Sequence, residues 1–323
     1  MEAKIKVGIV GGAGYTAGEL IRILVNHPAA EIVFVHSESS AGKPLWEVHT
    51  GLFGDTNLRF CSEYNLADID VLFLCSAHGK SREFWENNSA PEGLKVIDLA
   101  QDFRDESDGY VYGLPELQRE KIRGAQKIAN PGCFATAIQL ALLPLASRAL
   151  IHSDVCINAI TGSTGAGVKP SSTTHFSWRN NNISAYKVFE HQHLKEIRRN
   201  LSLLQSGFSS ELDFVPMRGD FARGIFAAVH LQCPLREEEA RELYKDYYKD
   251  AAFTFISDAP VDLKQVVNTN KCLLSLEKHG EKLVVCSVID NLLKGASGQA
   301  VQNMNLLFGL GEDTGLRLKA SAF

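Results

Sequence analysis

The stretch Val7–Ala17, which reads VGIVGGAGYTA, constrains the fold of this chain more than any other. The β-branched run Lys4–Val10 predicts a buried strand, and the apolar spacing after Ala17 predicts a helix. The glycines between them fit the G-x-G-x-x-A pattern, in which a tight turn brings the backbone close to a pyrophosphate at a helix N-terminus. Strand, glycine turn and helix in this order favour a dinucleotide-binding unit over glycines that serve only the sterics of a turn. The candidate nucleotide-binding residues of this turn are Gly11, Gly12, Gly14, Tyr15, Thr16 and Ala17.

Short apolar segments recur through the first 130 residues. Strands are expected at Glu31–Ser37, Asp70–Ser76 and Lys95–Ala100, each separated from the next by a helix or a loop. Strands that alternate with helical stretches are typical of a doubly wound parallel sheet. The first part of the chain is therefore expected to be a Rossmann-type α/β domain.

The second half has a different pattern, which predicts an α+β domain with a mixed sheet. We expect a helix from about Glu190, a charged surface helix at 236–250, and two strands within 272–290 joined by a hairpin at His279–Gly280. A last helix at 298–311 returns to the nucleotide domain. The expected division is therefore 1–132 with about 296–323 for the dinucleotide-binding domain, and 133–295 for the catalytic, substrate and oligomerisation domain.

Composition excludes several classes of protein. The chain has 323 residues and a net charge of −5, without the basic excess typical of nucleic-acid binding. No apolar run approaches the roughly 20 residues of a membrane span, and the short apolar start is not that of a signal peptide. The seven cysteines are widely spaced without a C-x-x-C pair, so we expect no metal site, and six of them are interpreted as small core residues. A reducing, cytoplasmic location is expected.

The end of the second predicted strand, FVHSESSAGKP, bears on the choice of cofactor. Glu38 is placed to bind a ribose 2′-hydroxyl, which favours NAD. Ser37, Ser39 and Lys43 are placed to bind a 2′-phosphate, which favours NADP. These residues do not decide between NAD and NADP.

The stretch NPGCFATAIQLALLP places Cys133 directly after Pro-Gly and before an apolar run of helical periodicity that Pro144 is expected to end or kink. A thiol at a helix N-terminus is stabilised as the thiolate, because unpaired N–H groups and the helix dipole lower its pKa. A thiolate is a good nucleophile toward acyl groups. Cys133 is therefore a candidate nucleophile, and the alternative is a small buried residue at a domain junction.

A thiolate nucleophile requires a proton partner, and FEHQHLKEI places His191 and His193 two residues apart at the start of an expected helix. Residues two apart on a helix point in different directions, so at most one of them should face the thiol. Basic groups after glycine-rich or aromatic turns are candidates to bind an anionic substrate, although each alone is more often a surface charge. They are Arg104, Lys169, Arg218 and Arg223.

Together these segments resemble the N-acetyl-gamma-glutamyl-phosphate reductases, which are related in fold to aspartate-semialdehyde dehydrogenase. The resemblance covers nearly the whole chain and is carried by GGAGYTAGEL, DLAQDFR, NPGCFATA, GSTGAGVKP, HQHLKEI and IDNLLKGASGQAVQNMNLLFG. It implies that Cys133 is the nucleophile, that His191 or His193 is the acid/base, and that Gly11–Ala17 holds NADP(H). It further implies that Asn291 lies near the nicotinamide and that Arg104 belongs to a phosphate site.

The implied reaction is the NADPH-dependent reduction of N-acetyl-L-glutamyl 5-phosphate to the 5-semialdehyde through a cysteine thioester, a step of arginine biosynthesis. Two departures matter. Ser37-Glu38 replaces the usual Ser-Arg of these enzymes, and the longer PMRGDFARGI leaves either Arg218 or Arg223 for the substrate carboxylate. Alternatives are a reductase of aspartyl or N-acetyl-aminoadipyl phosphate, a cysteine hydrolase without a cofactor, and a nucleotide-sensing protein with a silent site. We expect a homo-oligomer, either a dimer or a tetramer.

Overall fold

The structure is a computed structural model that describes residues 3–321, and these residues form two compact units. Unit 1 holds the residues up to Pro131 together with Ala296–Arg317. Unit 2 holds Gly132–Gly295 and the residues from Leu318. The outermost positions of the expected domains, residues 1–2 and 322–323, lie outside the described part of the chain.

Unit 1 is built on a seven-stranded sheet in the order β3-β2-β1-β4-β5-β7-β6, and every neighbouring pair is parallel. Its strands are β1 (Ile5–Val10), β2 (Ala30–His36), β3 (Phe60–Cys61), β4 (Val71–Leu74), β5 (Lys95–Asp98), β6 (Tyr110–Tyr112) and β7 (Lys127–Ala129). The central strand β4 is buried on both faces, as parallel strands between helical layers are. The predicted doubly wound parallel sheet is confirmed.

The helices of unit 1 are α1 (Tyr15–Leu24), α2 (Leu45–Val48), α3 (Lys80–Asn87), α4 (Pro115–Arg123) and α9 (Gly298–Leu307). Helix α9 contacts α1, α4 and β5, and all ten of its residues are buried. The last helix therefore belongs to the core of unit 1.

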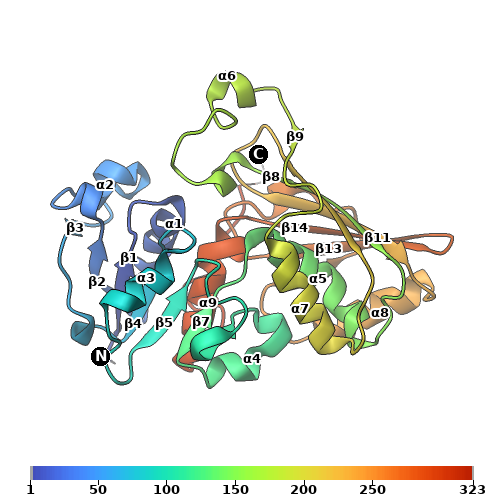
Figure 1. Ribbon diagram of the computed structural model, residues 1–323, viewed down its shortest axis with the longest axis horizontal. Coiled ribbons are helices and arrows are strands. Elements are labelled where there is room, and N and C mark those ends of the chain that lie inside the picture. The colour runs from blue at the N-terminus through green and yellow to red at the C-terminus, as the bar shows by residue number, and fades with distance from the viewer. Residues whose placement is uncertain (1–2, 322–323) are drawn as a thin grey trace. The chain divides into compact units, whose positions relative to one another are not determined.

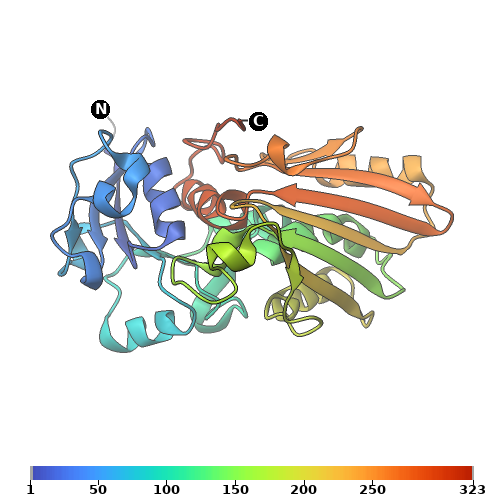
Figure 2. The same cartoon turned by 90° about the horizontal axis from the view of Figure 1, so that it is seen from above.

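Unit 2 contains a mixed seven-stranded sheet in the order β12-β13-β14-β11-β8-β10-β9, as the second half of the sequence predicts. Its strands are β8 (Val155–Thr161), β9 (Ser184–Ala185), β10 (Leu212–Arg218), β11 (Ile225–Gln232), β12 (Thr254–Ser257), β13 (Cys272–His279) and β14 (Lys282–Ile289). The hairpin β13–β14 is seen as two long antiparallel arrows in Figure 2. The helices are α5 (Cys133–Ser147), α6 (Phe176–Arg179), α7 (His193–Leu204) and α8 (Glu237–Tyr247).

Helices α5, α7 and α8 contact one face of this sheet, and on the other face Val261, Leu263 and Val266 pack against Phe226 and Val288. Helix α5 contacts α7, α8 and the strands β11, β13 and β14. Alternate residues of β8, β10 and β11 are buried on the helical side, and the residues between them are half-buried or exposed. We call this second side the outer face; its side chains include Cys156, Ile160, Val215, Met217, Ala228 and Val284.

Of the two outcomes expected at Pro144, an end of the helix is excluded, because α5 continues past the proline to Ser147. Proline lacks the N–H that would bond to the carbonyl of Leu140. The hydroxyl of Tyr248 donates to that carbonyl instead, at 2.6 Å. A hydrogen bond from outside the helix thus replaces the missing one.

The cysteines are less buried than the sequence suggests. Of the six expected core cysteines, Cys233 and Cys272 are buried, whereas Cys61, Cys75, Cys156 and Cys286 are only partly buried. No disulfide joins any of them in the described chain. A search of residues 3–321 finds no helix that is both long and apolar enough to span a membrane.

Candidate active site

Cys133 is the first residue of α5, and its side chain is partly accessible. Its neighbour Gly132 is the N-cap, with extended backbone angles, and no side chain caps this end of the helix. The first N–H groups of a helix have no partner within the helix, so they favour an anion at this end. A Cβ on Gly295 would lie only 2.9 Å from the Cβ of Cys133, so Gly295 brings main chain close to the thiol residue.

The imidazole of His193 lies against the residue that precedes Cys133. A Cβ built on Gly132 would lie 2.3 Å from His193 Nε2 and 2.6 Å from the two adjacent ring carbons. Glu196, one turn along α7, has Oε1 3.9 Å from His193 Nε2, while its Oε2 accepts the N–H of Gly132 at 3.1 Å. Glu196 therefore ties the first turn of α7 to the N-cap of α5 and faces the same histidine.

His191 lies outside the helix, because α7 begins at His193 and not near Glu190 as expected. For this reason the prediction that the two rings point apart is wrong: their centroids are 4.5 Å apart, and His191 Nδ1 accepts the backbone N–H of His193. Burial, and secondly the positive charges of Lys187 and Arg218, lower the pKa of His191 to about 4. His191 is therefore a neutral imidazole near pH 7.

Arg218 ends β10 and stacks over Tyr186, with its guanidinium carbon 4.7 Å from the ring centroid. Its Nε is buried and has no hydrogen-bond partner in the described structure. Burial, and secondly the charge of Cys133, raise the pKa of Tyr186 to about 12. The site thus brings a cation with an unused donor to the same cluster as Cys133 and His191.

The other basic candidates of unit 2 are placed differently. Arg223 donates from Nε and Nη2 to the two carboxylate oxygens of buried Asp290, at 3.0 and 3.1 Å. Two donors of the Arg223 fork are thus occupied by Asp290. Lys169 is exposed in the loop after β8.

Asn291, expected near a nicotinamide, uses both ends of its amide within unit 2. Its Oδ1 accepts the N–H of Gly224 at 2.7 Å, and its Nδ2 donates to Thr164 Oγ1 at 3.0 Å. It therefore fixes two loops of this unit to each other.

The glycine turn of unit 1 has the geometry that a pyrophosphate requires. Gly11 has φ of +82°, and a Cβ there would lie 2.8 Å from the carbonyl carbon of Cys75. A Cβ on Gly12 would lie 2.4 Å from Val35 Cγ1. Helix α1 begins at Tyr15 with Gly14 as its N-cap, without a side-chain cap and without an acid in its first turn. This open helix end fits a bound phosphate group.

The end of β2 carries the residues expected to select the nucleotide. Ser37 is buried with its hydroxyl 3.4 Å from that of Ser39, and Lys43 is exposed. The segment before β3 folds back onto this loop, since Phe60 N–H donates to the Lys43 carbonyl at 2.9 Å. Arg59 donates to the Gly42 carbonyl at 2.8 Å, which places a second cation beside Lys43.

Arg104 lies in unit 1 and is buried. Its Nε donates to the carbonyl of Asn130 at 2.9 Å, and Nη2 donates to that of Leu99 at 3.2 Å. These bonds connect the segments that follow β5 and β7. The described residues contain no cluster of three His, Cys, Asp or Glu side chains that suits a metal ion.

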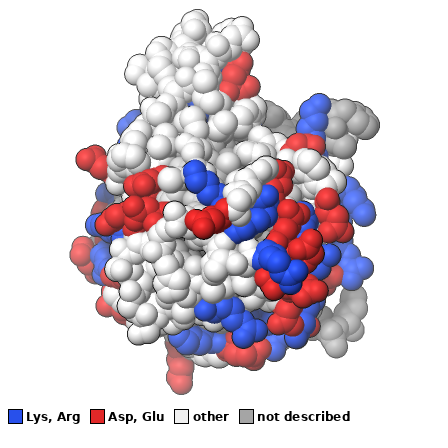
Figure 3. All heavy atoms as spheres, turned by 90° about the vertical axis from the view of Figure 1, so that its right-hand side faces the viewer, with Lys and Arg blue, Asp and Glu red and all other residues white. Residues whose placement is uncertain are grey.

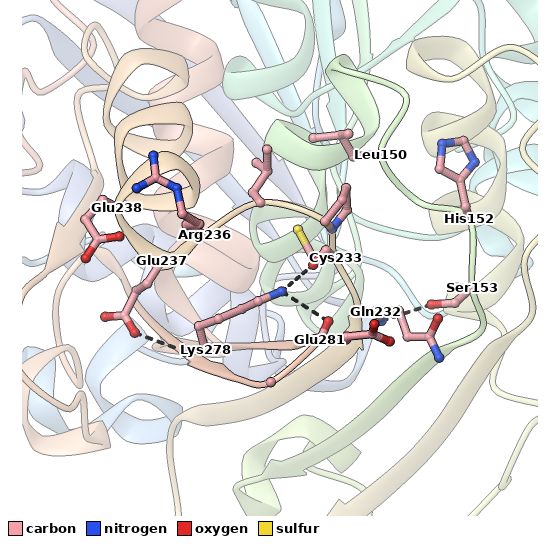
Figure 4. Close-up of a pocket in the computed structure, with 13 residues that line it drawn as sticks. Leu150, His152, Ser153, Gln232, Cys233, Arg236, Glu237, Glu238, Lys278 and Glu281 are labelled. Atoms are coloured by element: carbon pink, nitrogen blue, oxygen red, sulfur yellow. Dashed lines mark hydrogen bonds between the residues drawn. The ribbon is translucent and has the colours of Figure 1, made fainter.

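A pocket of about 680 Å³ lies elsewhere in unit 2, at the end of β11, and contains none of the candidate residues (Figure 4). Several of its polar groups surround Lys278. Lys278 Nζ donates to the carbonyls of Cys233 and Glu281, and the Lys278 N–H donates to Glu237.

Two family models match this chain, and the gap between their matches lies where the two units divide. The model "Semialdehyde dehydrogenase, NAD binding domain" matches residues 6–125, and "Semialdehyde dehydrogenase, dimerisation domain" matches residues 133–291. N-acetyl-gamma-glutamyl-phosphate reductase of Parabacteroides distasonis is 60% identical over 99% of this chain and 100% of its own length. The reductase of Phocaeicola vulgatus is 59% identical with the same coverage.

The chain belongs to the N-acetyl-gamma-glutamyl-phosphate reductase family.

Solved structures share the fold of this reductase family member. An aspartate semialdehyde dehydrogenase II from Vibrio cholerae, complexed with ASA, has a TM-score of 0.75 and 19% identity over 95% of this chain and 99% of its own. An aspartate semialdehyde dehydrogenase from Candida albicans with NADP has a TM-score of 0.70 and 16% identity over 95% of this chain and 99% of its own.

Sequence reasoning missed three residues of these sites: Glu196, Tyr186 and Arg59. Glu196 follows His193 by three positions, a spacing that puts both on one helix face, so HQHLKEI contained the signal. Tyr186 and Arg59 reach their places through pairing of distant strands, which the local pattern does not carry.

Proposed function

We propose that this chain catalyses the NADPH-dependent reduction of N-acetyl-L-glutamyl 5-phosphate to N-acetyl-L-glutamate 5-semialdehyde and phosphate. The observation that carries the proposal is the partly accessible Cys133 at the uncapped N-terminus of α5, with His193 against its neighbour Gly132. Family membership supports the choice of reaction, since the relatives bear this enzyme name.

In the proposed reaction the Cys133 sulfur attacks the acyl carbon while its proton passes to His193. The carbon–oxygen bond to phosphate breaks, inorganic phosphate leaves, and a thioester remains on the enzyme. The bound nicotinamide supplies the hydride that reduces this acyl group. The N–H groups of the first turn of α5 stabilise the oxyanion, and His193 returns its proton as the carbon–sulfur bond breaks. Two easier steps replace one difficult step.

His193 is assigned the proton transfer, and His191 is assigned a positioning role. With a pKa of about 4, the imidazole of His191 is neutral at pH 7, and its Nδ1 already accepts the backbone N–H of His193. Glu196 faces His193 and holds Gly132, so it favours the imidazolium that forms during acylation and fixes its distance from the thiol.

Arg218 is assigned the carboxylate of the substrate. Its buried Nε has no partner among the described residues, and its stacking on Tyr186 fixes the plane of the guanidinium. A fixed fork with a free donor suits a carboxylate. Lys169, exposed in the loop after β8, is retained as a further candidate to bind the anionic substrate, and Arg104 as a candidate for its phosphate.

We infer that NADPH is held by a dinucleotide-binding domain of residues 1–132 and about 296–323, which includes unit 1. The cradle at Gly11 and Gly12 and the open end of α1 support a site for the pyrophosphate. The 2′-phosphate would be held by Ser37, Ser39 and Lys43. Arg59 would supply the guanidinium that related enzymes usually have at the position of Glu38. Tyr15, Thr16 and Ala17 form the first turn of the helix at this site, and Asn291 is retained as the candidate near the nicotinamide.

We further infer a homodimer that forms through the outer face of the sheet in 133–295. The family model of this part of the chain is named for dimerisation, and the outer face carries the half-buried apolar side chains of Val215, Met217 and Val284. The cytoplasm is the proposed location, because the absence of disulfides in the described chain fits a reducing compartment.

The test is phosphate-dependent reduction of NADP by N-acetyl-glutamate semialdehyde, measured in the reverse direction at 340 nm. Aspartate semialdehyde and N-acetyl-aminoadipate semialdehyde serve as competing substrates, and Cys133→Ser serves as the inactive variant. The proposal expects the highest kcat/KM for the glutamate derivative and a loss of at least a hundredfold in the variant. A preference for another semialdehyde would overturn the substrate assignment.

A further inference from the structure

Residues 168–185 form an excursion between β8 and β10, here called the arm, which contains α6 and β9. In Figure 1 it projects from the end of the second sheet, beside β8 and β9. Only one of its residues, Arg179, is buried. A segment with so little core of its own cannot offset the conformational entropy lost on ordering unless it is buried against something else.

The arm exposes large apolar side chains among uncharged polar ones. Four large side chains are exposed on it: Val168, Phe176, Trp178 and Ile183, with Phe176 at 76% of its full accessibility. Lys169 and Arg179 are the only charged residues of the arm, and the lobe at the top of Figure 3 is nearly free of charged side chains. Contiguous exposed apolar side chains, aromatic ones above all, mark sites of association between proteins.

The arm is also joined to the proposed substrate site. Arg179 donates to the carbonyl of Arg218 at 2.5 Å, and to Ser184 Oγ at 3.1 Å. Strand β9 pairs with β10, where Ser184 lies opposite Arg218, and Tyr186 follows directly. The position of the arm and the positions of Arg218 and Tyr186 are therefore set by the same hydrogen bonds.

We propose that the apolar side chains of the arm are buried against a second copy of this chain, and that this contact holds Arg218 and Tyr186 in their working positions. A second copy is the occupant favoured here, because the arm lies within the part of the chain matched by a dimerisation domain, residues 133–291. The arm also continues the outer face, since β9 extends the sheet at Met217. The coupling to substrate rests on the proposed function, whereas the contact between copies does not.

The variant for the test replaces Phe176 and Ile183 together by serine, two exposed side chains whose loss leaves the core of unit 2 intact. Phe53→Ser is the matched control, because Phe53 is equally exposed, at 74%, but belongs to unit 1. Sedimentation velocity over a dilution series gives the dissociation constant of the oligomer. Circular dichroism checks that each variant is folded.

We expect the double variant to raise the dissociation constant at least tenfold and the control to leave it unchanged. At protein concentrations where the variant dissociates, its KM for the acyl phosphate should rise severalfold, while its KM for NADPH should stay the same. High protein concentration should restore the wild-type KM for the acyl phosphate. If the double variant assembles as the wild type does, the proposed contact between copies is overturned. If its KM for NADPH is also higher, the arm covers the nucleotide instead. Weaker assembly with an unchanged KM for the acyl phosphate overturns the coupling. If the wild type shows no reductase activity, sedimentation still decides the contact, and the proposed function alone fails.

Discussion

Replacing Gly132 by alanine changes the position of His193 without straining the backbone. Gly132 has φ of −70° and ψ of 151°, which alanine adopts freely. The new Cβ would lie 2.3 Å from His193 Nε2, while ordinary contacts are 3.4 Å or longer. The imidazole must therefore move by about 1 Å away from the new Cβ, and with it from its present place beside the N-cap of α5.

A displacement of about 1 Å in a catalytic group costs roughly a hundredfold in rate, or about 2.7 kcal/mol of transition-state stabilisation. We expect Gly132→Ala to lower kcat by this factor and to leave the Kd for NADPH unchanged, since the nucleotide candidates other than Asn291 belong to unit 1. Steady-state NADPH oxidation and fluorescence titration measure the two quantities.

Gly51→Ala is the matched control, because a Cβ there meets nothing within 4 Å. It should retain wild-type kcat, and thermal unfolding should show both variants folded. A Gly132→Ala enzyme with wild-type kcat would refute the reasoning, because it would mean that His193 is not the proton partner in this position.

Three further outcomes are expected. The pKa of His191 in the folded protein, about 4, lies below its ordinary 6.5, so its contribution to the free energy of unfolding is full above pH 6.5 and falls by about 2–3 kcal/mol toward pH 4. His191→Gln should flatten this part of a pH profile measured by urea unfolding. An unchanged slope would contradict the burial of this ring. Asp98 is fully buried, its Oδ2 has no hydrogen-bond partner among the described residues, and burial raises its pKa to about 6, so stability falls as pH rises from 3.8 to 6. Asp98→Asn should therefore raise the free energy of unfolding at pH 7 by about 2 kcal/mol, and a loss of stability would show that the ionised form is the favoured one. Arg59→Gln should lower kcat/KM for NADPH about tenfold with little effect on NADH, and an equal effect on both would remove Arg59 from the 2′-phosphate site.

The architecture of unit 1 could be predicted from local sequence pattern. Buried parallel strands are uniform apolar runs, so each can be recognised before its pairing partners are known. The end of the fourth expected strand shows the limit of this prediction. Leu99 and Ala100 lie past β5, since the ladder with β7 ends at Asp98. Hydropathy does not reveal where pairing stops.

The candidate site was only partly predictable for a related reason. Cys133 could be placed at a helix N-terminus because Pro-Gly and the apolar run are adjacent in sequence. The start of α7 at His193 was missed, since 190–192 have helical composition but Phe189 bonds to the backbone of Phe214 instead. The choice between Arg218 and Arg223 depends on Asp290, which is 67 residues from Arg223 along the chain and meets it only in the folded sheet.

The central claim is that Cys133 forms a covalent acyl intermediate before any hydride is transferred. Rapid mixing of the enzyme with N-acetyl-L-glutamyl 5-phosphate, without nucleotide, tests it by the amount of phosphate released in the first turnover. The account predicts a burst of one phosphate for each active site, together with a thioester on Cys133 in the mass spectrum, and neither in Cys133→Ser. A burst that persists in Cys133→Ser, or phosphate release that begins only when NADPH is added, would contradict it.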